Sequence, residues 1–150
     1  MVQKVYTRPE YLDADVVRFQ NNKEKWIAFV GLDEETKTPH EIFTGILDED
    51  NGIGIPNSIT CGRLRRVVGE NEKKRYDFEF TNRAGLKSTL CGVDTIFNSV
   101  YWNYGKFLSA VLRSRLPIAE VVSLLDGLNF ENDEERFWVT GVQKVLKKYL

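Results

Sequence analysis

The chain is poor in side chains that bind metals or act as nucleophiles. Its 150 residues include one histidine, His40, and two cysteines, Cys61 and Cys91, which lie thirty positions apart. A zinc or iron site normally takes two or more His or Cys ligands at suitable spacing, and neither cysteine has a Cys-x-x-Cys partner. We therefore expect no transition-metal site and no redox dithiol. Both cysteines are expected to be reduced thiols in or near the core, where free cysteine is most often found.

A catalytic triad would have to use His40, because the sequence has no other imidazole. This residue directly follows Pro39, beside a predicted strand and an acidic loop, and a solvated loop histidine is the favoured interpretation. A hydrolase centred on His40 and that loop is the weaker alternative. The loop brings together Asp48, Glu49, Asp50 and Asn51, which lack the spacing of an EF-hand. A solvated acidic turn is therefore favoured over a site for a hard cation.

Nucleotide fingerprints and membrane signals are also missing. Gly52, Gly54 and Gly62 fit neither the Gly-x-x-x-x-Gly-Lys-Ser/Thr pattern of a phosphate loop nor Gly-x-Gly-x-x-Gly. Charged residues interrupt the first apolar residues, which argues against a signal peptide, and no apolar run approaches the ~18 residues of a membrane span. We expect a cytoplasmic protein with no membrane partner.

The composition is typical of one small globular domain. Hydrophobic residues make up 42% and aromatic residues 12% of the sequence, enough to fill one core, so we expect a single domain over residues 1–150. The formal charge of -1 provides no overall attraction for nucleic acid or anionic lipid. Charge is nevertheless uneven, because residues 31–50 hold seven acids and one lysine, whereas residues 61–90 hold eight bases and four acids.

Runs of β-branched and aromatic residues predict a β-rich part over residues 15–92, after an N-terminal arm over residues 1–14. Residues 15–45 are the predicted nucleus of the sheet, in which Trp26 and Phe29 are expected to be structural. The predicted strands lie near residues 16–19, 25–30, 40–46, 63–68, 76–81 and 87–91.

The strand over residues 76–81 has the clearest alternation. Tyr76, Phe78 and Phe80 alternate with Asp77 and Glu79. Because successive side chains of a strand point to opposite faces, three rings share one face and two carboxylates share the other. We expect the rings to be buried beneath helices.

A helical part is predicted over residues 95–150, where the apolar period changes. The predicted helices cover residues 98–114, Pro117 to about Gly127, and residues 133 to about 149. Asn132 and Glu135 resemble a capping box for the last of them. Tyr101 and Trp102 are adjacent on a helix and cannot point the same way, so one of them is expected at an exposed interface or at the edge of the core. Strands followed by helices favour the α+β class, an antiparallel sheet of about six strands packed by about three helices.

A basic segment between residues 63 and 87 is the main basis for a binding hypothesis drawn from the residues alone. Its bases are Arg63, Arg65, Arg66, Lys73, Lys74, Arg75, Arg83 and Lys87. A sheet that presents rings and bases together can stack nucleobases and neutralise phosphates. The rings are expected to be buried, however, and Asp77 and Glu79 would repel phosphate, so a nucleic-acid or nucleotide-binding sheet is the alternative function. The residues assigned to such partner or phosphate contacts are Arg63, Arg65, Arg66, Lys74 and Arg75.

Ordered stretches along almost the whole chain resemble a known family. They are Arg8-Pro9, Asp15–Leu32, Glu41–Gly45, Arg75–Phe78, Tyr101–Tyr104, Val111–Arg113, Pro117-Ile118, Gly141-Val142 and Leu146–Tyr149. Together they are similar to the C-terminal extension of bacterial adenosylcobalamin-dependent (class II) ribonucleotide reductases. In that family the extension follows the barrel that holds the catalytic cysteines, the cobalamin site and the nucleotide sites, and it usually precedes a Cys-rich tail that relays reducing equivalents.

The resemblance implies an accessory role and not a catalytic one. Cys61 and Cys91 match neither the catalytic nor the terminal cysteine motifs, so no catalytic, cofactor-binding or metal residue is carried over to this chain. The implied function is an accessory domain of a vitamin B12-dependent ribonucleotide reductase, in deoxyribonucleotide synthesis, that positions the reducing tail or mediates subunit contact. Adenosylcobalamin would belong to the parent enzyme. The implied partners are the catalytic barrel, in cis or in trans, and a second copy of the chain, and we expect either an excised domain or a free-standing relative.

Overall fold

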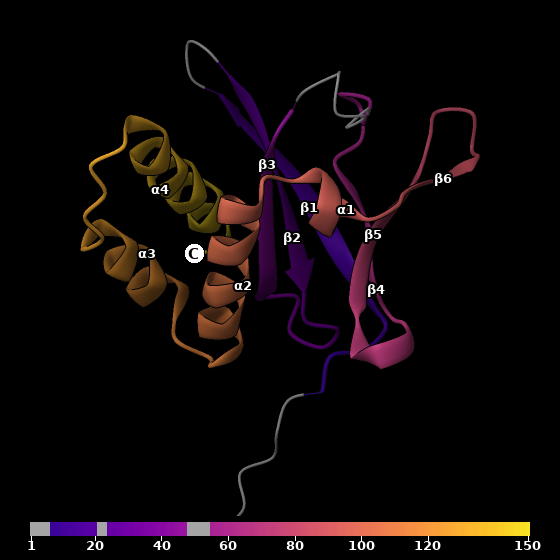
Figure 1. Cartoon of the computed structure of the whole chain (residues 1–150), viewed down its shortest axis with the longest axis horizontal. Helices are drawn as coiled ribbons and strands as arrows, with labels where there is room; N and C mark the ends of the chain where they lie inside the picture. Colours follow the sequence, from indigo (N-terminus) through magenta and orange to yellow (C-terminus); the bar gives the residue numbers. More distant parts are fainter. Residues whose placement is uncertain (1–6, 21–23, 48–54) are drawn as a thin grey trace, which may run out of the picture.

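The computed structural model describes residues 7–20, 24–47 and 55–150 (Figure 1). Its strands are β1 Tyr11–Gln20, β2 Lys25–Leu32, β3 Pro39–Ile46, β4 Cys61–Val68, β5 Lys74–Thr81 and β6 Lys87–Leu90. Its helices are α1 Val93–Ile96, α2 Ser99–Arg113, α3 Ile118–Asp126 and α4 Asp133–Leu146, with short 3-10 turns η2 Glu70–Glu72 and η3 Lys147–Tyr149. The predicted acidic loop, Asp48 to Asn51, lies outside the described residues together with Gly52 and Gly54.

Neighbouring strands run antiparallel in the order β3-β2-β1-β4-β5-β6. This confirms the α+β class, the six strands and the three longer helices, to which the structure adds α1. The sheet begins earlier than predicted, because Tyr11 to Ala14 belong to β1 and not to an N-terminal arm. Leu12 and Ala14 are buried on either side of Asp13, and Tyr11 pairs with Arg65. The pairing partner lies far along the chain, so the local sequence does not reveal this extension.

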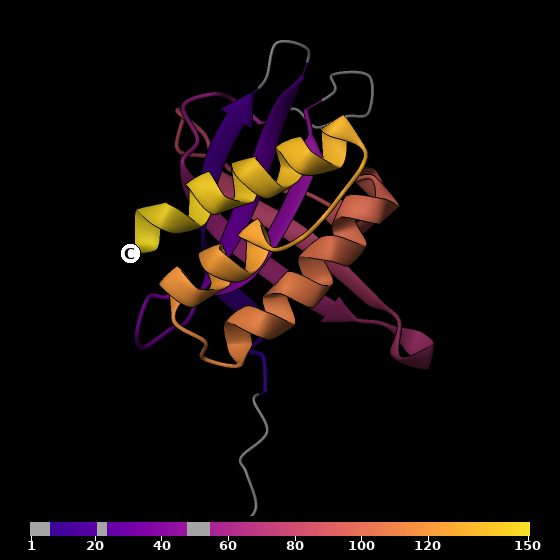
Figure 2. The same cartoon turned by 90° about the vertical axis from the view of Figure 1, so that its left-hand side faces the viewer.

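Strand β2 is buried on both faces of the sheet, which explains why its apolar run does not alternate. Trp26 packs on the helical side and meets the ring of Tyr101 edge-on, with centroids 4.9 Å apart. Phe29 packs on the opposite side, and both side chains are 0% exposed. The helices α2, α3 and α4 lie across the first of these faces (Figure 2). On that face the indole N–H of Trp138 donates to the hydroxyl of Thr44 at 2.8 Å, which ties α4 to β3.

The sheet curls strongly about its second face. In a flat sheet, β3 and β5 would lie about 19 Å apart, since four interstrand steps of about 4.8 Å separate them. Instead, Phe43 of β3 and Tyr76 of β5 have ring centroids 5.2 Å apart, and Phe29 of β2 stacks on Phe78 of β5 at 4.3 Å. The concave face thus encloses a second apolar cluster, to which Phe97 after α1 also belongs.

Helix α2 lies along β3 and divides its side chains between the two clusters. Tyr101 and Trp102 are both buried, 3% and 8% exposed, because they enter different clusters on the two sides of α2. The two rings thus point in different directions as expected, but neither is exposed. Gly105 permits the close approach, since a Cβ there would lie 2.8 Å from the backbone oxygen of Ile42. Ser109 accepts a hydrogen bond from the Ile42 amide at 3.0 Å and donates one to its carbonyl at 3.3 Å, so α2 satisfies the free edge of β3.

The N-terminus of α4 confirms half of the predicted capping box. The side chain of Asn132 accepts hydrogen bonds from the amides of Glu134 and Glu135 at 2.7 Å and 3.3 Å. The carboxylate of Glu135 accepts a hydrogen bond from the Tyr104 hydroxyl instead of closing the box. None of the helices in the described ranges is long and apolar enough to cross a membrane.

Candidate functional site

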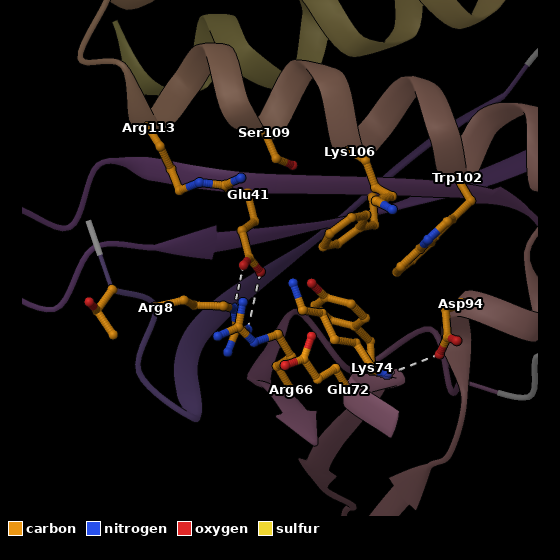
Figure 3. A pocket seen from close by; sticks show the side chains of 13 residues that line it. Arg8, Glu41, Arg66, Glu72, Lys74, Asp94, Trp102, Lys106, Ser109 and Arg113 are labelled. Carbon is orange, nitrogen blue, oxygen red and sulfur yellow. Dashed lines mark hydrogen bonds and ion pairs between the residues drawn. The ribbon is translucent and has the colours of Figure 1, made fainter. Parts of the chain in front are cut away.

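A pocket of about 720 Å³ opens on the concave side of the sheet, between α2 and the hairpin formed by β4 and β5 (Figure 3). Helix α2 contributes Trp102, Lys106, Ser109 and Arg113 to its lining. These residues follow one another at spacings of four, three and four, which places them along one side of a helix. The hydrogen bonds between Ser109 and β3 fix the rotation of α2, so Lys106 and Arg113 on either side of Ser109 extend toward the pocket.

The hairpin presents basic side chains on the opposite wall. Arg66 is two residues after the buried Leu64, and Lys74 is two residues before Tyr76, so both continue the concave face of their strands. Leu64 and Tyr76 are the last residues of β4 and β5 in this direction that belong to the second apolar cluster, and charged side chains follow them. Glu72, in the turn η2, also lines this wall.

A buried ion pair forms part of the pocket lining. The Arg8 guanidinium donates two hydrogen bonds to the Glu41 carboxylate, a short one from Nε to Oε1 and one from Nη2 to Oε2 at 3.1 Å. The side chains are 3% and 1% exposed. Arg8 also donates to the carbonyls of Pro9, Glu10 and Leu64, at 2.6, 2.9 and 3.2 Å. It therefore joins the segment before β1 to both β3 and β4.

Aromatic rings form another part of the lining. Trp102 stacks on Phe43 with centroids 4.1 Å apart, and Tyr76 meets the indole edge-on at 5.2 Å. Burial raises the pKa of the Tyr76 hydroxyl, and the nearby Glu41 carboxylate raises it further. The amide of Tyr76 donates to the Asp94 carboxylate at 2.9 Å, which links the start of β5 to α1.

The charges of the pocket do not balance. Arg8 and Glu41 neutralise each other. The remaining lining charges are the cations Arg66, Lys74, Lys106 and Arg113 and the carboxylates of Glu72 and Asp94. No carboxylate among the described residues forms an ion pair with any of these four cations. The pocket is thus suited to an anion.

The structure divides the basic residues that the sequence grouped together. Arg66 and Lys74 line the pocket, whereas the other three predicted contact residues pair with carboxylates outside it. Those pairs are Arg63 with Glu79 at 3.1 Å, Arg65 with Glu10 at 3.3 Å and Arg75 with Asp77 at 3.1 Å. Strand alternation separates the two groups, because residues 63 and 65 face away from residues 64 and 66.

The rings and carboxylates of β5 alternate as predicted, but one carboxylate is not open to solvent. Phe78 is fully buried, and Tyr76 and Phe80 pack partly against the same cluster. Asp77 on the other face is 3% exposed and accepts a hydrogen bond from the Gly92 amide at 2.9 Å. It therefore holds the start of α1 in addition to pairing with Arg75.

His40 belongs to β3 and its side chain is 12% exposed, so its interpretation as a solvated loop histidine is wrong. Its Nδ1 lies 3.9 Å from a carboxylate oxygen of Asp33. Hydrogen bonds from Thr36 lower the pKa of the Asp33 carboxyl. His40 does not line the basic pocket. In the described part of the chain, no three His, Cys, Asp or Glu side chains gather as a metal site.

The cysteines are free thiols, but both are exposed, so the expectation that they lie in or near the core is wrong. Cys61 begins β4 and Cys91 directly follows β6. Cys61 points outward because it alternates with the buried side chains of β4. The number and spacing of the cysteines do not reveal the register of that strand. From the pairing of β4 and β6 with β5, the two cysteines lie beside positions about four residues apart along β5, or about 13 Å. A disulfide requires Cα atoms within about 7 Å, so the two thiols do not form a dithiol in this fold.

Three cations of the site were not predicted from the sequence: Arg8, Lys106 and Arg113. The spacing of Trp102, Lys106, Ser109 and Arg113 was a signal for the last two, since it marks a second side of α2 distinct from its apolar side. Arg8 had no such signal, because its partner Glu41 is distant in the sequence.

The comparisons with known proteins agree with this architecture. The family described as NrdJ homologue C-terminal domain matches residues 12–150, so the chain belongs to that family. The match includes all of the described sheet and helices except the first residue of β1. It relates the chain to class II ribonucleotide reductase. The searches of curated proteins and of solved structures found no significant match.

Proposed function

We propose that the chain is a non-catalytic accessory domain of an adenosylcobalamin-dependent ribonucleotide reductase. It acts in deoxyribonucleotide synthesis by positioning a reducing tail near the catalytic barrel or by mediating subunit contact. The family match over residues 12–150 carries this proposal. In the proposal, the chain is one cytoplasmic domain, its partner is the catalytic barrel in cis or in trans, and adenosylcobalamin is bound by the barrel.

The chemistry of the chain supports an accessory role. Radical reduction of a ribonucleotide needs a cofactor-generated radical and a pair of thiols that supply two electrons. Cys61 and Cys91 are separated by about 13 Å along β5, so they do not form such a pair. Trp26 and Phe29 belong to the two apolar clusters and hold a rigid body together.

Binding to the reductase tests this proposal directly. A class II catalytic barrel and the 150-residue chain are prepared as separate polypeptides, and their association is measured by calorimetry. We expect a saturable complex, and we expect the chain alone to leave ribonucleotides unreduced with adenosylcobalamin and a dithiol. Turnover by the chain alone, or no complex at about 100 μM of each partner, would refute the proposal.

The alternative is a nucleic-acid-binding sheet, for which Arg66 and Lys74 provide the observation, since neither pairs with a described carboxylate. This alternative predicts salt-dependent binding to single-stranded oligonucleotides that Arg65→Ala weakens. Arg65 contacts Glu10 and lies over the ring of Tyr11, which favours a structural role for it. An absence of oligonucleotide binding at low salt would remove the alternative.

A further inference from the structure

The basic pocket brings like charges together without supplying their partners from the described residues. Arg66 and Lys74 come from the hairpin, while Lys106 and Arg113 come from the facing side of α2 (Figure 3). Against these four cations stand the carboxylates of Glu72 and Asp94, which leaves a surplus of two positive charges. Because like charges repel more strongly in a partly enclosed pocket than in open solvent, a bound anion would relieve this repulsion.

The geometry favours phosphate groups over a single carboxylate. Two guanidinium groups offer paired N–H donors that match phosphate oxygens, and two ammonium groups add point charges. A di- or triphosphate carries enough negative charge to match the surplus of two. The volume of about 720 Å³ lies in the range of about 300–1,000 Å³ typical of small-molecule sites.

Aromatic side chains also border the cations. Trp102 and Tyr76 line the pocket beside the cations, and Ser109 adds a hydroxyl that is already bonded to β3. Aromatic rings beside a phosphate site allow a base to pack against them. A ligand whose base contacts these rings should therefore bind more tightly than inorganic polyphosphate, which the probes below test.

We propose that the pocket between α2 and the β4–β5 hairpin binds a small di- or triphosphate, with its phosphate groups held by Arg66, Lys74, Lys106 and Arg113. This site goes beyond the accessory role, because it belongs to the chain itself and requires no reductase partner. It also differs from an extended nucleic-acid surface, since Arg63, Arg65 and Arg75 on the other side of the hairpin pair with carboxylates.

Calorimetry on the full chain at low salt tests the site with three probes: pyrophosphate, ATP and adenosine. We expect pyrophosphate and ATP to bind and adenosine to show no binding. Lys106→Gln and Arg113→Gln should each weaken pyrophosphate binding about tenfold or more, because each removes a charge-assisted contact. Glu72→Gln should strengthen it, since it removes one of the two opposing charges. Lys148→Gln, at an exposed lysine outside the pocket, is the matched control and should change nothing.

The outcomes separate the possible sources of the ligand. Tighter binding of ATP than of pyrophosphate would support a nucleotide, whereas equal affinities would support recognition of the phosphates alone. The proposal is wrong if pyrophosphate and ATP show no binding up to about 5 mM. It is also wrong if adenosine binds as tightly as ATP, or if Lys148→Gln weakens binding as much as Arg113→Gln. These results do not depend on whether the chain associates with a reductase barrel.

Discussion

The buried ion pair between Arg8 and Glu41 should be the most sensitive polar contact of the fold. Replacing Arg8 with Met keeps most of the side-chain volume but leaves the Glu41 carboxylate, 1% exposed, without its bidentate partner. Removing one member of a buried pair typically costs about 3–5 kcal/mol, because the other charge stays buried and uncompensated. We therefore expect Arg8→Met to lower the free energy of unfolding by about that amount.

The reciprocal change should cost less, and the structure gives the reason. In Glu41→Gln the Arg8 guanidinium keeps the carbonyl acceptors of Pro9, Glu10 and Leu64. Three charge-assisted hydrogen bonds compensate part of the lost carboxylate. The double variant Arg8→Met/Glu41→Gln removes both charges and should cost less than the two single variants together, because no uncompensated charge stays buried.

Urea unfolding of the wild type, both single variants and the double variant measures these costs as a double-mutant cycle. The expected coupling between Arg8 and Glu41 is at least about 2 kcal/mol, within the range found for residues in direct contact. Lys37→Met and Asp13→Asn provide a matched cycle at an exposed pair, 57% and 61% exposed, where the coupling should be near zero. Additive effects at Arg8 and Glu41, or a larger cost for Glu41→Gln than for Arg8→Met, would refute the reasoning.

Three further predictions test the fold. Trp26→Ala and Phe29→Ala should each lower the free energy of unfolding by about 3–5 kcal/mol in urea titrations, because each empties a fully buried site; a loss below about 1 kcal/mol would contradict that burial. Gly105→Ala should lower the free energy of unfolding by about 1–3 kcal/mol in the same measurement, because its Cβ would lie 2.8 Å from a backbone oxygen of β3. An unchanged urea midpoint would show that α2 can shift freely. Burial raises the pKa values of Tyr101 and Tyr149, whose hydroxyls also donate to carboxylates. As the pH rises, the unfolded state therefore loses these protons before the folded state does. The free energy of unfolding should fall above about pH 10, by up to about 1.4 kcal/mol per pH unit for each tyrosine. Tyr149→Phe should make this fall less steep when unfolding is measured from about pH 8 to 12.

Local patterns in the sequence predict most of the secondary structure. The apolar run of residues 25–30, the alternation of residues 76–81 and the capping side chain of Asn132 each act over a few neighbours, and each gives the observed element. The predictions that failed depend on distant pairing. The exposure of Cys61 follows from the register of β4 against β1 and β5, and the extension of β1 to Tyr11 follows from its pairing with β4.

The sequence predicted only part of the pocket, because the pocket also depends on contacts between distant residues. Composition placed Arg66 and Lys74 in a basic segment, but it also grouped them with three arginines that lie on the other side of the hairpin. The curl of the sheet decides which group is enclosed, and that curl results from ring contacts such as Phe29 with Phe78. Such contacts join residues whose separation along the sequence carries no local signal.

The position of α2 connects the fold with the proposed binding site. A curled sheet whose outer strands approach each other would close into a barrel if its edge strands paired directly. Here α2 lies along the edge of β3, where Ser109 satisfies the backbone of Ile42, and the β4–β5 hairpin stays separated from that edge. The helix thereby replaces direct strand pairing and leaves an opening lined by Lys106 and Arg113 on one side. Because the opposite side of α2 packs with α3 and α4, a ligand held in this opening would contact the same helix that anchors the helical layer.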